Sequence, residues 1–437
     1  MSIRNNFILL LSKTAGRFIS LLKIGTGSTW PGHIALFLNK NFIRETLPSR
    51  LKIVLIAGTN GKTTTTSVLT YILKKQGLKV FHNEEGANLL NGIASAIIRN
   101  YRFDKHTTDT AIFEIDENTL PQILSQISPN AVVLLNLFRD QLDRYGEVNT
   151  LSENWLKSLQ HLSPETHVFL NADDPRINYL GIDLKAQVSY FGLPEKFMSQ
   201  KNIPHDVDSV YCPKCSRELV YKKMSYSHLG DYECPNCHYK RTVPETFDRE
   251  DFTYSLLGLY NIYNIHAAVL VAHQIFEIPI GTIKRHLSRF QPVFGRQESL
   301  NFRDKDVLIL LSKNPTGFNQ TIEVVKNSIR ERCTILIILN DRIPDGLDIS
   351  WIWDVEFEEL VAEKKVRKII VSGDRTYDMA LRFLYTESNK NVQPIDDLEK
   401  AINLAVQVTK AGEKIIIMAT YSGMLEARKI LLGRKLS

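Results

Sequence analysis

Ala57-Gly58-Thr59-Asn60-Gly61-Lys62-Thr63-Thr64 is the stretch that decides the fold, and it directly follows the apolar, β-branched run Leu51–Ala57. After the glycines, residues 62–76 have the composition of a helix, which Gly77 ends. A strand that turns through glycines into a helix is typical of a phosphate-binding loop, because backbone N–H groups at a helix N-terminus point at the ligand. The strict pattern requires glycine at position 56, where Ile56 stands, so this loop is a shortened variant.

This loop predicts nucleotide binding. Lys62 is placed to reach the β- and γ-phosphates, and the Thr63 hydroxyl is placed to bind Mg²⁺. The alternative is a chance Gly-Lys-Thr at a helix start, which the preceding strand disfavours. The residues predicted to bind ATP here are Gly58, Thr59, Asn60, Gly61, Lys62, Thr63 and Thr64.

Beyond the loop, short apolar runs alternate with helical periodicity, which predicts an α/β fold built on parallel sheets covered on both faces. Residues 206–241 interrupt the first block as an insertion that holds two cysteine pairs, and a second, smaller Rossmann-like block begins near residue 301. The expected strands are Leu51–Ala57, Ala111–Ile115, Ala131–Leu137, His167–Leu170, Val188–Phe191, Val307–Leu311, Thr334–Leu339, Val366–Val371 and Lys414–Met418. The expected helices include Asn261–Phe276, Thr321–Ile329, Tyr377–Tyr385 and Leu398–Val408.

The composition is that of a globular protein. At 437 residues the chain has room for about two to four domains. With 43% hydrophobic and 23% charged residues, disorder, collagen and coiled coil are excluded. The net charge of +6 is too small to argue for a nucleic-acid partner. Residues 1–50 carry that whole excess, with seven basic side chains against the single acid Glu45, which favours an acidic or phosphate-bearing partner for this segment.

The basic N-terminal segment also contains an amphipathic pattern. Helical spacing places its apolar residues on one face: Ile8, Leu11, Ala15, Phe18 and Leu22. Lys13, Arg17 and Ser20 fall on another face. We expect a helix docked on the protein's own core, with a helix lying on a membrane surface as the alternative. The apolar run Phe7–Leu11 is too short for a membrane span or a signal peptide, so we expect a cytoplasmic protein, with peripheral contact at the inner face of the membrane left open.

Four of the five cysteines form two Cys-x-x-Cys pairs separated by eighteen residues: Cys212, Cys215, Cys234 and Cys237. This spacing predicts a zinc ribbon, because each pair makes a knuckle that directs two thiolates at one ion. Two disulfides are the rival interpretation, which a cytosolic chain disfavours. All four ligands come from the protein, so the predicted zinc is structural. Cys333 lies in an apolar run and is expected to be buried in a strand.

The phosphate loop and several later stretches resemble the Mur ligase and folylpolyglutamate synthetase superfamily. Glu114, in Ile112-Phe-Glu-Ile-Asp116, stands where that superfamily carries a Mg²⁺-binding glutamate, so the resemblance implies that Glu114 and Thr63 bind magnesium. The other matching stretches are Asn136–Gly146, Asn171–Pro175, Asn261-x-x-Asn264 and Phe294–Glu298. They imply that Asn261, Asn264 and Arg296 contact the nucleotide. Gln141 and Tyr145 replace two histidines of the pattern, which leaves a second metal site open.

Two departures point to one branch of the superfamily. Only some fifty residues precede the phosphate loop, where the peptide ligases carry a whole domain of about a hundred residues or more, and the cysteine insertion is foreign to them. With Ser350–Asp354 and Gly373–Ala380, these features are similar to the MurT family, the synthetase subunits of lipid II isoglutaminyl synthase. The implied domains are a basic amphipathic segment (1–50), a Mur-ligase-type central ATP-binding domain (51–298, zinc ribbon 206–241) and a C-terminal α/β domain (299–437).

This resemblance implies ATP-dependent amidation of the α-carboxylate of D-glutamate in the peptidoglycan stem peptide, carried by lipid II or a soluble precursor. An acyl phosphate would form and ammonia would convert it to D-isoglutamine, with Lys62 and Glu114 as catalytic residues. Ammonia would come from a GatD-like glutaminase in a heterodimer, because no cysteine of this chain is left to act as the nucleophile. The resemblance implies that Asp354 completes the partner's Cys-His pair, with Asp348 as the fallback; a helix cap after Trp353 is the structural alternative for Asp354.

Two other function classes stay open. A Mur or folylpolyglutamate-type ligase would add an amino acid in place of ammonia, and the short N-terminus and the insertion argue against it. A nucleic-acid-binding module built on the ribbon would leave the ATP motifs unexplained. Lys313, in Lys313-Asn314-Pro315, is expected either to steady the acyl phosphate at the domain cleft or to be an ordinary loop lysine.

Overall fold

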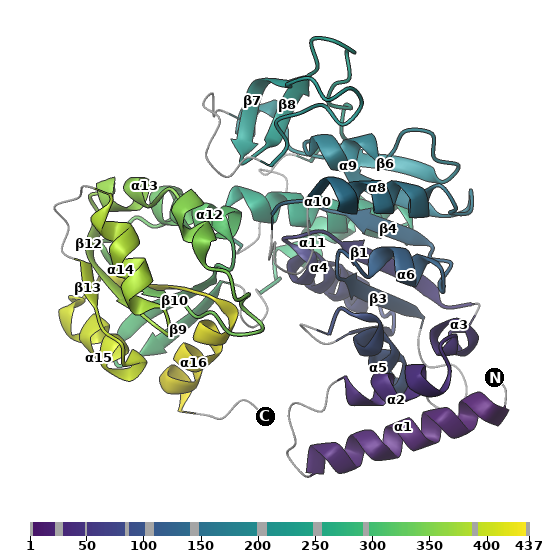
Figure 1. The fold of residues 1–437 in the computed structure, drawn as a ribbon, viewed down its shortest axis with the longest axis horizontal. Helices are drawn as coiled ribbons and strands as arrows, with labels where there is room; N and C mark the ends of the chain where they lie inside the picture. Colours follow the sequence, from purple (N-terminus) through teal and green to yellow (C-terminus); the bar gives the residue numbers. More distant parts are fainter. Residues whose placement is uncertain are drawn as a thin grey trace.

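A computed structural model describes residues 3–21, 29–48, 50–83, 87–100, 109–139, 148–198, 208–247, 256–291, 297–386 and 392–433. Figure 1 shows two α/β units side by side, a small hairpin of β7 and β8 above the larger unit, and α1 along its lower edge. Each unit is built on its own six-stranded sheet. The predicted α/β class is therefore confirmed, while the domain boundaries at residues 50 and 298 stay a prediction.

The larger sheet has the strand order β2-β3-β1-β4-β5-β6, and all its pairs are parallel. Its strands are β1 (Lys52–Ala57), β2 (Val80–His82), β3 (Thr110–Ile115), β4 (Ala131–Leu134), β5 (His167–Asn171) and β6 (Gln187–Phe191). Its helices are α4 (Lys62–Lys75), α5 (Leu90–Asn100), α6 (Leu120–Leu124), α8 (Val148–Leu159), α9 (Pro175–Tyr179), α10 (Leu259–Gln274) and α11 (Ile280–Leu287), and the 3-10 turn η1 (Glu195–Phe197) follows β6.

Alternate residues of β1 serve two cores, one on each face of this sheet. Val54 and Ile56 pack with residues of α4 and α10, whereas Ile53 and Leu55 pack with residues of α5 and with Trp155 of α8. Burial on both faces explains why the strand is a continuous apolar run with no polar alternation. The carboxyl ends of the parallel strands therefore all open at one edge of the sheet, where ligands bind in folds of this kind.

The second sheet has the order β13-β12-β11-β14-β10-β9. Its strands are β9 (Glu298–Phe302), β10 (Lys305–Leu311), β11 (Cys333–Ile338), β12 (Val366–Ser372), β13 (Val392–Pro394) and β14 (Lys414–Ala419). Its helices are α12 (Pro315–Ser328), η3 (Ser350–Asp354), α13 (Phe357–Ala362), α14 (Thr376–Leu384), α15 (Leu398–Val408) and α16 (Tyr421–Leu432). Cys333 is fully buried in β11, as predicted.

The second sheet is mixed, which the sequence pattern did not predict. β9 pairs antiparallel with β10, and the two-residue turn between them holds Arg303 and Asp304 at positive φ. A two-residue turn with both residues at positive φ fits the twist of a hairpin but usually carries Asn-Gly. The Arg-Asp sequence therefore did not indicate a hairpin at this position. Two other boundaries differ from the expected ones by more than two residues. β4 ends at Leu134, because the chain then turns to the phosphate loop, and α12 begins at Pro315, where Asn314 caps the helix.

The N-terminal helices are α1 (Ile3–Leu21), α2 (Trp30–Leu38) and α3 (Phe42–Thr46). Ile8 and Leu9 of α1 are buried, which agrees with a helix docked on the protein. The expectation that Leu11 belongs to the buried face was wrong, because its side chain is 41% exposed. Within the described ranges, no helix is long and apolar enough to cross a membrane.

Candidate functional site

The phosphate loop adopts a conformation that requires glycine at two positions. Gly58 has φ +142° and Gly61 has φ +94°, both in the region that side chains disfavour. A Cβ on Gly61 would lie 2.1 Å from Oδ1 of Asn264, and a Cβ on Gly58 would lie 2.9 Å from Cβ of Leu135. The loop is therefore in close contact with its neighbours, and α4 begins directly at Lys62 with its backbone N–H groups at the carboxyl end of β1.

Lys62 and Thr63 each contact an acidic residue after or within β3. The Lys62 Nζ donates to the Gly58 carbonyl and lies 3.3 Å from Oε1 of Glu117, and the Thr63 hydroxyl donates to Oε2 of Glu114 at 2.8 Å. Both glutamates are buried. Glu117 was not predicted from the sequence. The signal that could have found it is its place in the acidic run that begins at Glu114.

Oxygen donors are the ligands that Mg²⁺ takes, and it is commonly held by one or two carboxylates together with phosphate and water. The Thr63 hydroxyl and the Glu114 carboxylate supply such donors beside the loop, so the residues present fit the ion. Asn83 holds Glu114 in place, because its side chain donates to the Glu114 carbonyl at 2.9 Å and accepts from the Glu114 N–H at 2.9 Å.

The segment after β4 forms a wall against the phosphate loop. The Asn136 carbonyl accepts from the Thr59 N–H at 3.1 Å, and its side chain accepts from the Asn60 N–H at 2.8 Å and donates to the Asn60 carbonyl at 3.0 Å. This explains the matching motif at Asn136: the side chain fixes the loop. Residues 140–146 of that motif, including Gln141 and Tyr145, lie outside the described residues, as does Arg296.

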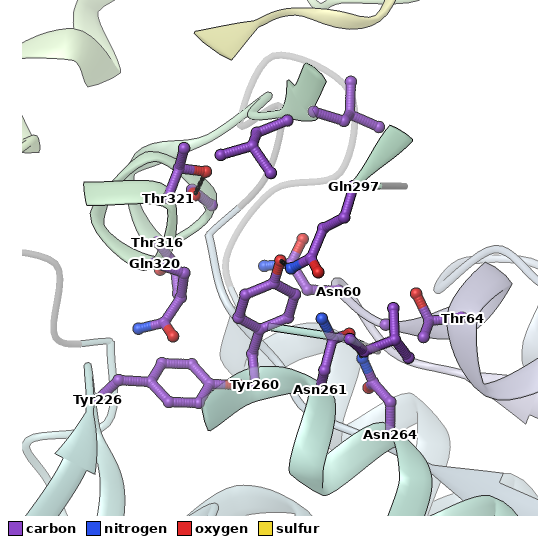
Figure 2. A pocket seen from close by; sticks show the side chains of 15 residues that line it. Asn60, Thr64, Tyr226, Tyr260, Asn261, Asn264, Gln297, Thr316, Gln320 and Thr321 are labelled. Atoms are coloured by element: carbon purple, nitrogen blue, oxygen red, sulfur yellow. Dashed lines mark hydrogen bonds between the residues drawn. The ribbon is translucent and has the colours of Figure 1, made fainter. Parts of the chain in front are cut away.

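A pocket opens between the phosphate loop, the first turns of α10 and the second sheet (Figure 2). Asn261 and Asn264 lie on its floor, linked by a 3.2 Å hydrogen bond. The residues that line it are Asn60, Gly61, Thr64, Tyr226, Leu256, Tyr260, Asn261, Asn264, Gln297, Leu310, Leu311, Thr316, Gly317, Gln320 and Thr321.

Several lining residues were not predicted individually from the sequence, although Gln297 belongs to the matching stretch Phe294–Glu298. Gln297 bonds both the N–H and the carbonyl of Leu257 at 2.7 Å, and its amide donates to the Tyr260 hydroxyl. The unit built on the second sheet contributes Thr316 and Gln320 from its helix α12. Asn314 donates to Oδ1 of Asn60 at 3.4 Å, so the stretch that holds Lys313 does reach the junction between the two units.

Asp354 lies at the end of η3, some way from the phosphate loop in sequence, and faces the larger unit. Its carboxylate is 3.5 Å from the Arg139 guanidinium and is 39% exposed. Arg139 also binds the buried carboxylate of Asp208. The helix after Trp353, α13, has Glu356 and not Asp354 at its N-cap position, and Asp348 accepts from the N–H and the hydroxyl of Ser350 at 2.8 and 3.0 Å. Asp354 thus remains half-exposed and accessible to a partner.

The four cysteines meet in the cysteine lobe, residues 208–241, around the hairpin of β7 (Val220–Tyr226) and β8 (Leu229–Glu233). Their sulfur atoms all lie within 4.8 Å of one another, with Cys212 and Cys237 at 3.6 Å and Cys215 and Cys234 at 3.4 Å. Four sulfurs about 2.3 Å from one zinc ion would be about 3.8 Å apart, so the cluster fits that ion. Burial raises the pKa of the Cys212 thiol, whereas hydrogen bonds from Asn236 and from the Arg217 N–H lower the pKa of the Cys215 thiol. A zinc ion would bind all four as thiolates.

The same lobe is anchored on the loop after β5 by two buried acid–base pairs. The Arg241 Nε donates to Asp173 at 2.7 Å, and Nε2 of His228 lies 3.2 Å from Asp174. Burial raises the pKa of Asp173, although Arg241 opposes this. For Asp174, burial also acts to raise the pKa, but His228 and backbone N–H groups hold it below its ordinary value. Asp173 and Asp174 are therefore structural here, and Asp174 also binds the Leu137 N–H beside the phosphate loop at 2.9 Å.

Family models and relatives identify this arrangement. Residues 56–272 match the Mur ligase middle domain, and residues 311–424 match the MurT ligase C-terminal domain. The chain is 32% identical to "Lipid II isoglutaminyl synthase (glutamine-hydrolyzing) subunit MurT" of Streptococcus pneumoniae, over 98% of this chain and 97% of the relative. The protein of the same name from Staphylococcus aureus is also 32% identical, over 86% of each chain.

Solved structures agree on the fold. A pseudomurein peptide ligase type C from Methanothermus fervidus has a TM-score of 0.65 at 22% identity, covering 89% of this chain and 80% of that one. MurF ligase from Thermotoga maritima in complex with ADP has a TM-score of 0.61 at 17% identity, covering 92% and 85%. With a relative matched across nearly its full length at more than 30% identity, this chain belongs to the MurT family of the Mur ligase superfamily.

Proposed function

We propose that this chain is the synthetase subunit of a two-subunit amidating ligase that acts on lipid II. In this reaction ATP phosphorylates the α-carboxylate of D-glutamate in the stem peptide, and ammonia converts the product to D-isoglutamine. The observation that carries the proposal is the near full-length match to the MurT subunit of lipid II isoglutaminyl synthase. In this chain the phosphate loop, Glu114 and a pocket beside them meet at one edge of the sheet.

The first step supplies a leaving group that a carboxylate lacks. An oxygen of the substrate carboxylate attacks the γ-phosphorus of ATP, the bond to the β-phosphate oxygen breaks, and ADP leaves with that electron pair. Lys62 and the N–H groups of the loop bind the phosphate oxygens, which carry the charge in such transfers. Thr63 and Glu114 would hold Mg²⁺, which neutralises phosphate charge when bound.

In the second step the nitrogen of ammonia attacks the acyl carbon, inorganic phosphate departs with the electrons of the C–O bond, and a proton leaves the nitrogen to give the amide. This step needs neutral ammonia and no water, because water would hydrolyse the acyl phosphate. The pocket lies between the two units, so the second sheet helps to enclose the reacting groups.

Ammonia would come from glutamine hydrolysed by a separate glutaminase subunit, as the wording "glutamine-hydrolyzing" in the relatives' name supports. Cysteine is the usual nucleophile for that hydrolysis, and here four cysteines cluster together while Cys333 is fully buried. Asp354 is our candidate to orient the partner's catalytic histidine. The surface beside it exposes large apolar side chains, as a protein interface does: Trp353, Leu381, Leu384 and Tyr385.

Zinc in the cysteine lobe is also part of the proposal, as a structural ion with no role in the chemistry. A two-stranded hairpin is marginally stable by itself, and a four-cysteine site would stabilise it. We place the reaction in the cytoplasm, where ATP is available.

Changing the ammonia source tests the proposal. The Asp354→Asn variant, assembled with the glutaminase, should lose glutamine-dependent amidation and keep amidation driven by ATP and free ammonium. Asparagine keeps the size of the side chain but cannot stabilise a histidinium. Asp348→Asn is measured beside it because Asp348 is the fallback: if Asp354→Asn keeps both activities, Asp348 becomes the better candidate for the glutaminase role. Equal loss of both activities in Asp354→Asn would assign Asp354 to the synthetase site or the fold.

The same assay distinguishes amidation from peptide ligation. Peptide ligation is the alternative because a solved structure of this fold is named as a peptide ligase. Replacing ammonium by amino acids should give no product. An amino-acid adduct formed faster than the amide would refute the amidation proposal.

A further inference from the structure

The first two helices expose an unusual amount of apolar surface. We call it the α1–α2 surface and define it by seven side chains that are between 37% and 89% exposed: Ile3, Phe7, Leu10, Leu11, Trp30, Phe37 and Leu38. Single exposed apolar residues are ordinary, but a group of this size on two adjacent helices indicates a binding surface. In Figure 1, α1 and α2 lie along the edge of the molecule, away from the second sheet.

Folding does not account for this surface, because α1 has a separate apolar face for its own packing. Ile8 and Leu9 are buried against the protein, and on the same face Asn5 donates to Glu45 at 2.8 Å. Ile3, Phe7 and Leu10 follow the spacing i, i+4 and i+7 on the opposite, exposed side. α1 therefore has two apolar faces, and this chain buries only the face of Ile8 and Leu9. The other face is left for a binding partner to cover.

The two helices also form an open groove. The groove is lined by Leu11 of α1, by Thr29, and by Trp30, His33, Ile34, Phe37 and Leu38 of α2. Five of these seven side chains are apolar or aromatic, and Thr29 and His33 are the polar members. Trp30 is of a residue type enriched at the boundary between lipid headgroups and acyl chains.

The charges around this surface are positive. Arg4, Lys13, Lys40 and Arg44 lie on the N-terminal helices or beside them, and residues 1–50 contain the single acid Glu45. Glu45 accepts from Asn5 and from Asn39, at 2.8 and 3.0 Å, so its charge is held among hydrogen-bond donors. An apolar face bordered by lysine and arginine is the combination that binds anionic lipid surfaces, where basic side chains meet the headgroups and apolar ones enter the acyl region.

The surface is rigidly connected to the catalytic edge. Gly32 of α2 packs on α5 so closely that a Cβ would lie 1.8 Å from the Asn91 carbonyl, and its N–H donates to Ser95 at 2.8 Å. The chain before α5 contacts the site, because the Asn88 carbonyl accepts from the Asp116 N–H at 3.1 Å, two residues beyond Glu114. The α1–α2 surface is thus linked through α5 to the segment that follows Glu114.

We propose that the α1–α2 surface docks on an anionic lipid bilayer and thereby presents the catalytic edge to a substrate that is anchored in that bilayer. The choice of a lipid-linked substrate rests on the proposed function, whereas the binding to lipid does not. Phe37 and Ile3 enter the acyl region and the basic residues contact anionic headgroups. The protein binds peripherally and reversibly, since the anchoring area is small.

Vesicle sedimentation with the full-length chain in complex with its glutaminase tests the docking. Vesicles of phosphatidylcholine, with and without phosphatidylglycerol, are the probe. The wild type should sediment with the anionic vesicles, less with the neutral ones, and less as salt is added. Phe37→Asp and Ile3→Asp should each lower binding by about tenfold, because each places a charge where an apolar group is buried in lipid. Val243→Asp is the matched control: Val243 is 90% exposed, as Phe37 and Ile3 are at 89%, but lies in another part of the protein.

Wild-type protein that stays in the supernatant, or equal binding by the Phe37 and Val243 variants, would overturn the docking. So would a change of molecular mass in Phe37→Asp without a change in vesicle binding, since the surface would then join protein chains. Amidation assays separate this outcome from the proposed function. On a soluble stem-peptide substrate all variants should match the wild type, and on vesicle-embedded substrate Phe37→Asp should be slower. If the wild type binds vesicles as expected but amidates neither substrate, the docking stands and the proposed function fails.

Discussion

Replacing Arg241 by methionine would remove the guanidinium from a carboxylate that has no contact with solvent. Asp173 is 0% exposed, and the Arg241 side chain is only 10% exposed. Their contact at 2.7 Å joins the cysteine lobe to the loop after β5. After the change, Asp173 would keep two donors, the Tyr263 hydroxyl at 2.6 Å and the Leu193 N–H at 2.9 Å. Methionine is similar in length, so packing is largely retained and the charge is the main quantity altered.

The free energy of unfolding should fall by about 3–4 kcal/mol near pH 7. Breaking one side of a buried ion pair costs about 3–5 kcal/mol, because the remaining charge is left uncompensated. Protonation sets an upper limit: neutralising a carboxyl of ordinary pKa, about 3.9, at pH 7 costs about 4 kcal/mol. Burial already raises the pKa of Asp173 in the presence of Arg241, so the variant can avoid a buried unpaired charge by protonating Asp173.

The pKa shift of Asp173 determines how the loss of unfolding free energy changes with pH. Without Arg241, the folded-state pKa of Asp173 rises further above its unfolded value. Such a group contributes its stability at low pH and loses it as the pH rises through the folded-state pKa. The deficit relative to wild type should therefore shrink as the pH falls from 7 to 5, by up to about 1.4 kcal/mol per unit.

Urea unfolding followed by tryptophan fluorescence at both pH values measures the deficit. Adding Asp173→Asn to Arg241→Met should recover part of it, because a neutral amide needs no counter-charge. Arg217→Met, an exposed arginine of the same lobe, should change stability by less than about 0.5 kcal/mol. A deficit under about 1 kcal/mol, or one that does not change with pH, would show that Asp173 is not left charged and buried, and the reasoning would be refuted.

Three further predictions concern the proposed ATP and zinc sites. Lys62→Ala and Glu114→Gln should each abolish ATP-dependent amidation while the circular dichroism spectrum stays that of the wild type, and near-normal turnover by either variant would remove it from the site. Gly61→Ala should raise the KM for ATP, because the new Cβ would displace Asn264 and the positive φ costs about 1–2 kcal/mol; an unchanged KM would contradict the proposed role of Asn264 in the pocket. Cys212→Ser should lower the melting temperature before it affects chemistry, and metal analysis of wild-type protein purified without chelator should find one zinc per chain, whereas a metal-free protein of normal stability would exclude the structural ion.

Local sequence signals predicted the parts of this protein that depend on neighbours in the chain. The strand, the two glycines and the helix start of the phosphate loop are contiguous, so the position of Lys62 and Thr63 at the start of α4 was predicted directly. Both Cys-x-x-Cys pairs are local knuckles as well. Only the approach of the two pairs to one another in space depends on a tertiary contact. The alternation of buried strands and helices was sufficient for the fold class because both faces of a parallel sheet are covered, which leaves long apolar runs.

Contacts between distant segments were not predictable in the same way. Glu117 meets Lys62 across fifty-five positions, and Gln297 enters the pocket from the start of the second sheet. Leu11 was assigned to the buried face because helical spacing alone does not show which of two apolar faces the protein covers. In each case the deciding interaction is tertiary, and periodicity within one element carries no information about it.

The cysteine lobe shows how such distant contacts can serve the site. Its buried side chains Arg241 and His228 bind the adjacent acids Asp173 and Asp174, and these in turn bind Tyr263 of α10 and the Leu137 N–H. α10 is the helix whose first turns carry the asparagines of the pocket floor, and Leu137 follows the asparagine that holds the phosphate loop. Arg241 and His228 can hold this network only if the hairpin is ordered, and two strands alone are marginal. A structural zinc would therefore act on the nucleotide pocket without touching a substrate, by keeping two buried side chains in place.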